Sequence, residues 1–278
     1  MTARSDLEEG FMILTGMLDG VATLTLSGPP VNAISDEWLT VFDQALDRLR
    51  IHKCTVLHIR SNQKVFCAGA DLAEMSTRMT LADGADRMYA YVARIQRLFA
   101  RIEQLPQVTV AEVGGAAMGG GLELALACDL RLAATEAKLG LPEVRLGLIP
   151  GAGGTQRLTR RCGPAVAARL ILGAEIVDGT TARELGIVQW AFPRARLAEE
   201  AADTVRRIAE LPAAALAECK ACIAAAGRPG RDGFVDELEA TRRLFSDEDT
   251  RQRVQAFVAK STRTQRPMQR KREMEAAP

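Results

Sequence analysis

The chain has 278 residues, of which 47% are hydrophobic and 26% charged, and its formal net charge is +1. This size and balance are ordinary for a globular protein with a large core, and a charge close to zero excludes general attraction to nucleic acid or acidic membranes. The apolar stretch 11–18 follows acidic residues and is too short for a membrane span or a signal peptide core, so we expect a cytoplasmic protein.

The first part of the chain alternates strand-like and helix-like segments. Residues 20–28 alternate and are rich in β-forming side chains, which predicts a strand that ends before two prolines. Ser35 is a good N-cap for a following helix, whose apolar residues recur at helical spacing from Trp38 onward. A second strand is expected at 55–59.

The next part repeats this order around two glycine-containing loops. The loop 66–72 precedes a long amphipathic helix that stops at Leu105, before a proline. Residues 108–113 form the next predicted strand, and the glycine-rich loop 114–121 leads into a short helix near 122–127. Repeated strand, loop and helix predict an α/β layered fold.

The last third of the chain changes in composition, because Ala, Glu and Arg dominate and helical periodicity continues. We therefore expect an α/β core at 1–194 and a helical region at 195–260. Ser246, followed three residues later by Asp249, is typical of a capping box that opens the last helix. The basic, weakly patterned segment 261–278 is expected to be a mobile tail.

The six cysteines predict neither a disulfide scaffold nor a metal site. Cys219 and Cys222 form a C-x-x-C in an Ala-rich helical stretch, with no second cysteine or histidine pair nearby. The chain has two histidines, whereas structural zinc takes four ligands. We therefore interpret the pair as reduced helical cysteines and expect no metal.

Two loops could bring backbone amides close to a ligand. Gly69 and the glycines 119–121 each follow a predicted strand, and glycine permits close approach and positive φ. The second loop also opens a helix, where free N–H groups and the helix dipole attract negative charge. It lacks the Lys-Ser/Thr of a P-loop, which disfavours phosphate binding. Tight turns alone would also explain such glycines.

Two glutamates stand among apolar neighbours near these loops. Glu123 lies in the first turn of the predicted helix, and Glu143 lies in the apolar segment 140–154. A carboxyl group kept partly dry has a raised pKa and can transfer a proton near neutral pH, and two such groups can divide acid and base roles. Complementing the helix dipole is the alternative reading of Glu123, and the spacing does not show that the two residues meet.

Three segments, in order, resemble the signature blocks of the crotonase superfamily, and most of all those of enoyl-CoA hydratases. They are FCAGADL at 66–72, GGGLELALACD at 119–129 and LPEVRLGLIPGAGGTQRL at 141–158. The similarity runs from about residue 12 to 260. It implies an α/β spiral of repeated ββα units, followed by a helical C-terminal region through which the subunits form a homotrimer or hexamer.

The resemblance also implies roles for individual residues in the reversible addition of water to the α,β double bond of an acyl-CoA thioester. The backbone amides of Ala70 and Gly120 would form an oxyanion hole. Glu123 would hold and deprotonate the water, and Glu143 would deliver a proton to the α-carbon.

Coenzyme A would enter as part of the substrate, not as a permanently bound cofactor. The resemblance places it along Lys64, Ala68, Asp71 and Leu72, where Lys64 either meets a phosphate or is an ordinary solvated lysine. Residues 73–86 fall where the family varies most, and they do not identify the acyl group.

Other functions remain open at this point. Both glutamates are present, which favours hydration over isomerisation and over a non-catalytic acyl-CoA binder, but a hydroxyacyl-CoA dehydratase or lyase would use similar chemistry. One branch of the superfamily binds RNA, and four arginines form a basic stripe on the long predicted helix. They are Arg87, Arg94, Arg97 and Arg101. Aromatic residues for base stacking are scarce, at 4%, so a solvated or intersubunit face is the preferred interpretation.

Overall fold

The computed structural model describes residues 8–10, 12–49, 54–226 and 230–260. These residues form two compact units, one up to Leu211 and one from Pro212. The division falls at this point rather than near residue 195, because helix α7 (Arg194–Ala209) packs against strands of the first unit. The tail predicted at 261–278 lies outside the described residues.

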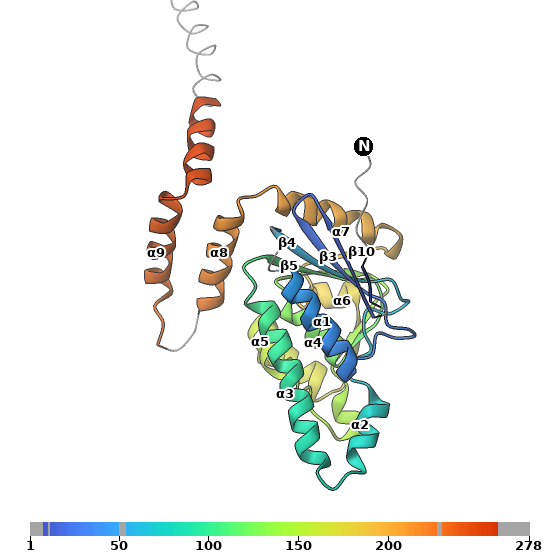
Figure 1. The fold of residues 1–278 in the computed structure, drawn as a ribbon. Coiled ribbons are helices and arrows are strands. Elements are labelled where there is room, and N and C mark those ends of the chain that lie inside the picture. The colour runs from blue at the N-terminus through green and yellow to red at the C-terminus, as the bar shows by residue number, and fades with distance from the viewer. Residues whose placement is uncertain (1–7, 11, 50–53, 227–229, 261–278) are drawn as a thin grey trace, which may run out of the picture. The chain divides into compact units, whose positions relative to one another are not determined.

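The first unit is built around a seven-stranded sheet with the strand order β1-β2-β3-β4-β5-β7-β10 (Figure 1). Its strands are β1 (Glu8–Gly10), β2 (Ile13–Leu18), β3 (Val21–Leu26), β4 (Val56–Ser61), β5 (Val108–Val113), β7 (Leu130–Ala134) and β10 (Trp190–Phe192). The first three strands pair antiparallel, and every pairing from β3 to β10 is parallel.

A second layer of short extended segments accompanies this sheet. Strands β6 (Ala117–Met118), β8 (Lys138–Gly140) and β9 (Ile176–Asp178) pair in that order, and isolated parallel bridges join Ile34 to Ala70 and Cys67 to Ala117. The chain thus passes repeatedly from a strand of the large sheet to an extended segment of the second layer and on to a helix. This is the predicted spiral of ββα units.

The helices of this unit include all those expected there and several that were not expected. They are α1 (Asp36–Leu49), α2 (Leu72–Met79), α3 (Gly84–Glu103), α4 (Gly120–Ala127), the 3₁₀ helix η1 (Glu143–Leu146), α5 (Gly154–Ile171) and α6 (Gly179–Glu184), followed by α7. Ser35 caps α1 as expected, since its Oγ accepts the N–H of Trp38 at 3.0 Å. Helices α2, η1, α5 and α6 were not expected, and α2 follows directly on the loop 66–72.

Helix α4 is buried along its whole length. All eight of its residues are buried, and Glu123 is the single charged residue among them. A helix that is apolar on every side belongs in a protein interior. Its burial therefore places one carboxyl group in the core beside the helix N-terminus.

The second unit consists of α8 (Ala213–Ala225), α9 (Gly233–Phe245) and a helix at 248–260. Arg243 on α9 donates two hydrogen bonds of 2.7 Å to Glu218 on α8. The last helix begins one residue later than expected, because Asp247 and not Ser246 is its cap: Asp247 Oδ2 accepts the N–H of Thr250 at 2.8 Å.

Candidate active site

A cavity of about 730 Å³ in the first unit brings together the four residues expected to act on a substrate. Glu123, Glu143, Ala70 and Gly120 all line it, and most of the remaining wall is apolar. A concave, largely apolar space with a few convergent polar groups is the usual form of a small-molecule site.

The backbone amides of Ala70 and Gly120 are neighbours in this cavity. A Cβ built on Gly120 would lie 3.5 Å from the Ala70 nitrogen. Ile34 pairs with the residues on either side of Ala70, since its N–H donates to Gly69 O and its carbonyl accepts from Asp71 N. Within the described parts of the chain, neither the Ala70 nor the Gly120 N–H donates a hydrogen bond. Both are free to bind an oxygen.

Glycine is required at two positions around these amides. Gly69 has φ +96°, and a Cβ there would lie 2.8 Å from Met118 O. Gly119 has φ +50°, and a Cβ there would lie 2.9 Å from Glu143 Oε1. Residues other than glycine rarely adopt these backbone conformations. The glycines of both loops therefore allow the close backbone approach that was expected.

Glu123 is 2% exposed, and its Oε1 accepts the backbone N–H of Gly154 at 2.7 Å. Burial raises the pKa of this carboxyl to about 8, because the charged form loses its hydration. The Gly154 N–H opposes the rise, and the negative charge of Glu143 adds to it. The two carboxyl groups therefore influence one another.

Glu143 begins helix η1 on another part of the cavity wall. Burial raises the pKa of its carboxyl as well. Its Oε2 is buried, and among the described residues this oxygen has no hydrogen-bond partner. A buried polar atom of this kind is unusual in a folded protein, and it can hold a proton for a bound molecule.

Arg157 supports the Glu123 side of the site and was not identified from the sequence. The residue is buried on α5, where its guanidinium donates to Ala152 O and to Glu103, both at 2.7 Å. It thereby fixes the loop that carries the Gly154 N–H. Its place in the third signature block was the one available signal.

Tyr91 supports the part of the site that holds the Ala70 amide, and it too was not identified from the sequence. Its hydroxyl donates to Ile34 O at 2.5 Å, and its ring, 3% exposed as a residue, lies under the guanidinium of Arg78 at 4.3 Å. Since Ile34 pairs with the backbone flanking Ala70, Tyr91 helps to hold that amide in place. A hydroxyl that binds a distant carbonyl leaves no pattern in the sequence.

The residues expected along coenzyme A divide into two groups. Ala68 and Leu72 line the cavity, whereas Lys64 and Asp71 are not among its lining residues. Lys64 is exposed. Asp71 caps α2, since its Oδ1 accepts the N–H groups of Ala73 and Glu74 at 2.9 and 3.0 Å.

Three of the four arginines in the basic stripe on α3 are paired with acidic side chains. Arg87 pairs at 2.8 Å with Asp83, the N-cap residue of this helix. Arg94 pairs with Asp36 of α1, and Arg101 contacts two further aspartates of α1, Asp43 and Asp47. Compensation of this kind weakens the case for a phosphate-binding face.

The six cysteines all lie in the described ranges, and none of them forms a disulfide. The described ranges contain no group of three or more His, Cys, Asp or Glu residues arranged to hold a metal ion. None of the helices in those ranges is long and apolar enough to cross a membrane.

Comparison with known proteins identifies the family. Residues 16–265 match the family model described as enoyl-CoA hydratase/isomerase. A Bacillus subtilis protein named probable enoyl-CoA hydratase is 38% identical over 246 residues, which cover 86% of this chain and 93% of that protein. Mouse mitochondrial methylglutaconyl-CoA hydratase is 43% identical over 159 residues, or 56% of this chain and 49% of that protein.

The solved structures agree with this assignment. The crystal structure of a Geobacillus kaustophilus enoyl-CoA hydratase matches with a TM-score of 0.87 at 31% identity, covering 92% of this chain and 97% of that chain. The chain therefore belongs to the enoyl-CoA hydratase/isomerase family, within the crotonase superfamily.

Proposed function

We propose that this protein is an enoyl-CoA hydratase, a hydro-lyase that adds water reversibly to the α,β double bond of an acyl-CoA thioester. One observation carries the proposal: two carboxyl groups with raised pKa values and two backbone amides without partners in the described chain line a single cavity. The names of the family and of the relatives support the same reaction.

The two amides would stabilise the enolate. Attack of water at the β-carbon moves negative charge onto the thioester oxygen, which the N–H groups of Ala70 and Gly120 would bind. In other enzymes, removing one such donor costs roughly 3–4 kcal/mol of transition-state stabilisation. Gly120 also starts α4, so the helix dipole favours the developing charge.

The two carboxyl groups would divide acid and base roles. Burial raises the pKa of both carboxyl groups, that of Glu123 to about 8, so the pair keeps one proton near neutral pH. We assign the water to Glu123, which acts as the base when the shared proton lies on Glu143; the Gly154 N–H stabilises the ionised Glu123 carboxylate. Glu143 would deliver the proton to the α-carbon. Coenzyme A would be bound only as part of the substrate, along Ala68 and Leu72.

Hydration of crotonyl-CoA tests the proposal, followed by loss of the absorbance of the unsaturated thioester. We expect Glu123→Gln and Glu143→Gln each to lose at least about a hundredfold in kcat, within the range that general acid–base groups contribute. Glu184→Gln, a change at an exposed glutamate outside the cavity, is the matched control.

Full activity in either cavity variant would refute the two-carboxylate mechanism. Inactivity of the unaltered protein on several enoyl-CoAs, with the fold intact, would point instead to another crotonase reaction, such as isomerisation or a lyase step.

We also propose that the helical C-terminal unit assembles the protein into a homotrimer or hexamer. Several large apolar side chains of this unit are at least 70% exposed, which is costly in water. They are Ile223, Phe234, Leu238, Phe245 and Phe257. Sedimentation of the full chain should give a trimer or hexamer, and a stable monomer at micromolar concentration would contradict this assembly.

A further inference from the structure

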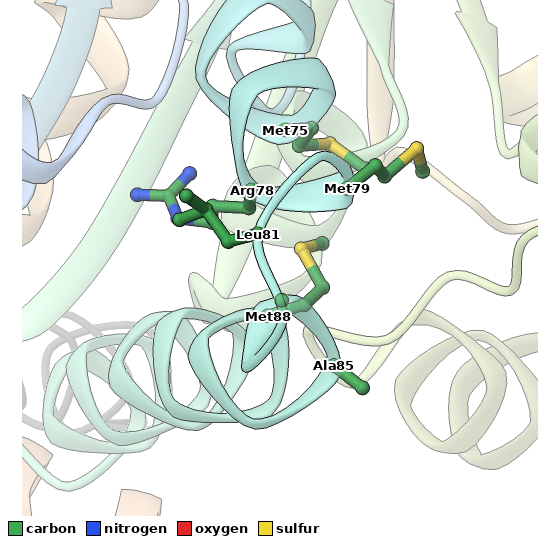
Figure 2. Close-up of a pocket in the computed structure, with 7 residues that line it drawn as sticks. Met75, Arg78, Met79, Leu81, Ala85 and Met88 are labelled. Atoms are coloured by element: carbon green, nitrogen blue, oxygen red, sulfur yellow. The ribbon is translucent and has the colours of Figure 1, made fainter.

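A second, smaller cavity of about 310 Å³ adjoins the active-site cavity and lies between α2 and the start of α3 (Figure 2). It is lined by Met75, Arg78, Met79, Leu81, Gly84, Ala85 and Met88. Three of these residues, Met75, Ala85 and Met88, also line the cavity that contains the two glutamates. The two spaces therefore share a wall made of these three side chains.

The side chains of this shared wall can change conformation easily. Met75 is buried and Met88 half-buried, and both are unbranched thioethers with three rotatable bonds. Ala85 contributes only a methyl group to the wall. A change of methionine rotamer can therefore join the two spaces without movement of the backbone.

The residues that line the larger cavity disfavour an acyl group that carries a negative charge. No Arg, Lys or His is among the residues that line the larger cavity, whereas Glu123 and Glu143 are. A free carboxylate on the acyl group would thus lose its hydration and meet negative charge with no cation to compensate it.

Arg78 of the smaller cavity does not supply that cation. Its guanidinium already contacts Asp36 at 2.5 Å and Glu74 at 3.0 Å, and it lies over the ring of Tyr91. Figure 2 shows the guanidinium pointing away from the methionine side chains. Its charge is therefore compensated within the protein.

We infer that the substrates are neutral aliphatic enoyl thioesters longer than the four carbons of crotonyl, whose tail passes Met75 and Met88 into the smaller cavity. This inference rests on the hydratase function proposed above. The inferred substrates differ from methylglutaconyl-CoA, the substrate in the name of the mouse relative, because the methylglutaconyl group is short and carries a carboxylate.

Binding of saturated thioesters, which cannot be hydrated, tests the tail cavity independently of the reaction. By calorimetry, decanoyl-CoA should bind the full-length protein at least about tenfold more tightly than butyryl-CoA, since each buried methylene contributes up to roughly fourfold. Methylglutaryl-CoA should bind more weakly than decanoyl-CoA. Equal or weaker binding of decanoyl-CoA, or a preference for methylglutaryl-CoA, would overturn the inference.

Ala85→Trp tests the route of the tail, because an indole ring in the shared wall would block the passage between the two cavities. We expect it to abolish the tenfold preference for decanoyl-CoA. Ala90→Trp is the matched control, because Ala90 is exposed on the same helix and lines neither cavity, and it should keep the preference. If Ala85→Trp does not fold by circular dichroism, the smaller change Ala85→Leu should reduce the preference. An unchanged preference in the folded variant would refute the route.

These results separate the two proposals. Hydration of crotonyl-CoA without a preference for decanoyl-CoA would refute the tail cavity and leave the hydratase function standing. Tight binding of decanoyl-CoA without hydration of any enoyl-CoA would do the reverse.

Discussion

Glu123 and Gly154 are in direct contact: Oε1 of the Glu123 carboxylate accepts the Gly154 N–H at 2.7 Å, and a Cβ built on Gly154 would lie 2.9 Å from the same oxygen. That Cβ would also lie 2.8 Å from Pro150 Cβ. The site thus has no room for a side chain at position 154, and the position of the proposed base depends on a glycine.

Gly154→Ala should therefore displace the Glu123 carboxylate. A misplacement of about 1 Å can cost on the order of a hundredfold in rate, so we expect a loss of this size in kcat for crotonyl-CoA. Gly16→Ala is the control, because a Cβ at Gly16 meets no atom within 4 Å. Equal activity of the two variants would show that the base tolerates the shift.

The pH dependence of hydration should reveal the shared proton of the carboxyl pair. The pKa of Glu123 is raised from an ordinary 4.5 to about 8, so the pair loses its last proton as the pH rises through about 8. We expect kcat/KM to fall above that pH, since no acid remains, and to fall at low pH when both groups are protonated. A profile that stays flat to pH 10 would contradict the assignment.

Protein stability should depend on the same group. The folded state holds a proton on Glu123 up to about pH 8, whereas the unfolded chain releases it near 4.5. The stabilisation from that proton is complete below pH 4.5 and is lost as the pH rises to about 8, by up to about 1.4 kcal/mol for each pH unit. Denaturant unfolding at pH 6 and pH 9 should show a smaller decrease for Glu123→Gln than for the unaltered protein. Identical decreases would mean that Glu123 is ionised throughout.

Tyr91→Phe should affect the oxyanion hole without creating a gap in the cavity wall. The change removes the hydrogen bond to Ile34 O and keeps the ring under Arg78. A hydrogen bond of this kind contributes about 1 kcal/mol, so we expect kcat to decrease about fivefold while KM for crotonyl-CoA stays nearly constant. A change in KM alone would indicate a role in substrate binding and not in holding Ala70.

The sequence predicts those parts of the fold that depend on local patterns. Strand β5 begins and ends where expected, because its β-forming residues lie between Pro106 and Gly114. Helix α2 was missed, since it has eight residues and follows directly on a loop. The start of the last helix was misplaced by one residue because Ser246 and Asp247 are both good caps.

The site shows the same limit. Burial of Glu123 could be anticipated from the apolar run around it. Arg157 and Tyr91 could not, because they bind backbone carbonyls: that of Ile34 lies 57 residues from Tyr91 in the chain, and that of Ala152 carries no side-chain signal. The meeting of Glu123 with Glu143 also depends on tertiary packing, and before the structure only the family resemblance indicated it.

Helix α4 places one proposed oxyanion donor, Gly120, and the proposed base, Glu123, within a single buried helical turn. The lining of the proposed tail cavity comes from another part of the chain, α2 and the start of α3. Under the proposed function, mutations in α2 and the start of α3 would change which acyl groups are accepted, while the spacing of base and amide would stay constant. The proposed determinants of substrate range and of reaction type thus lie in separate segments, so that one could diverge while the other is conserved.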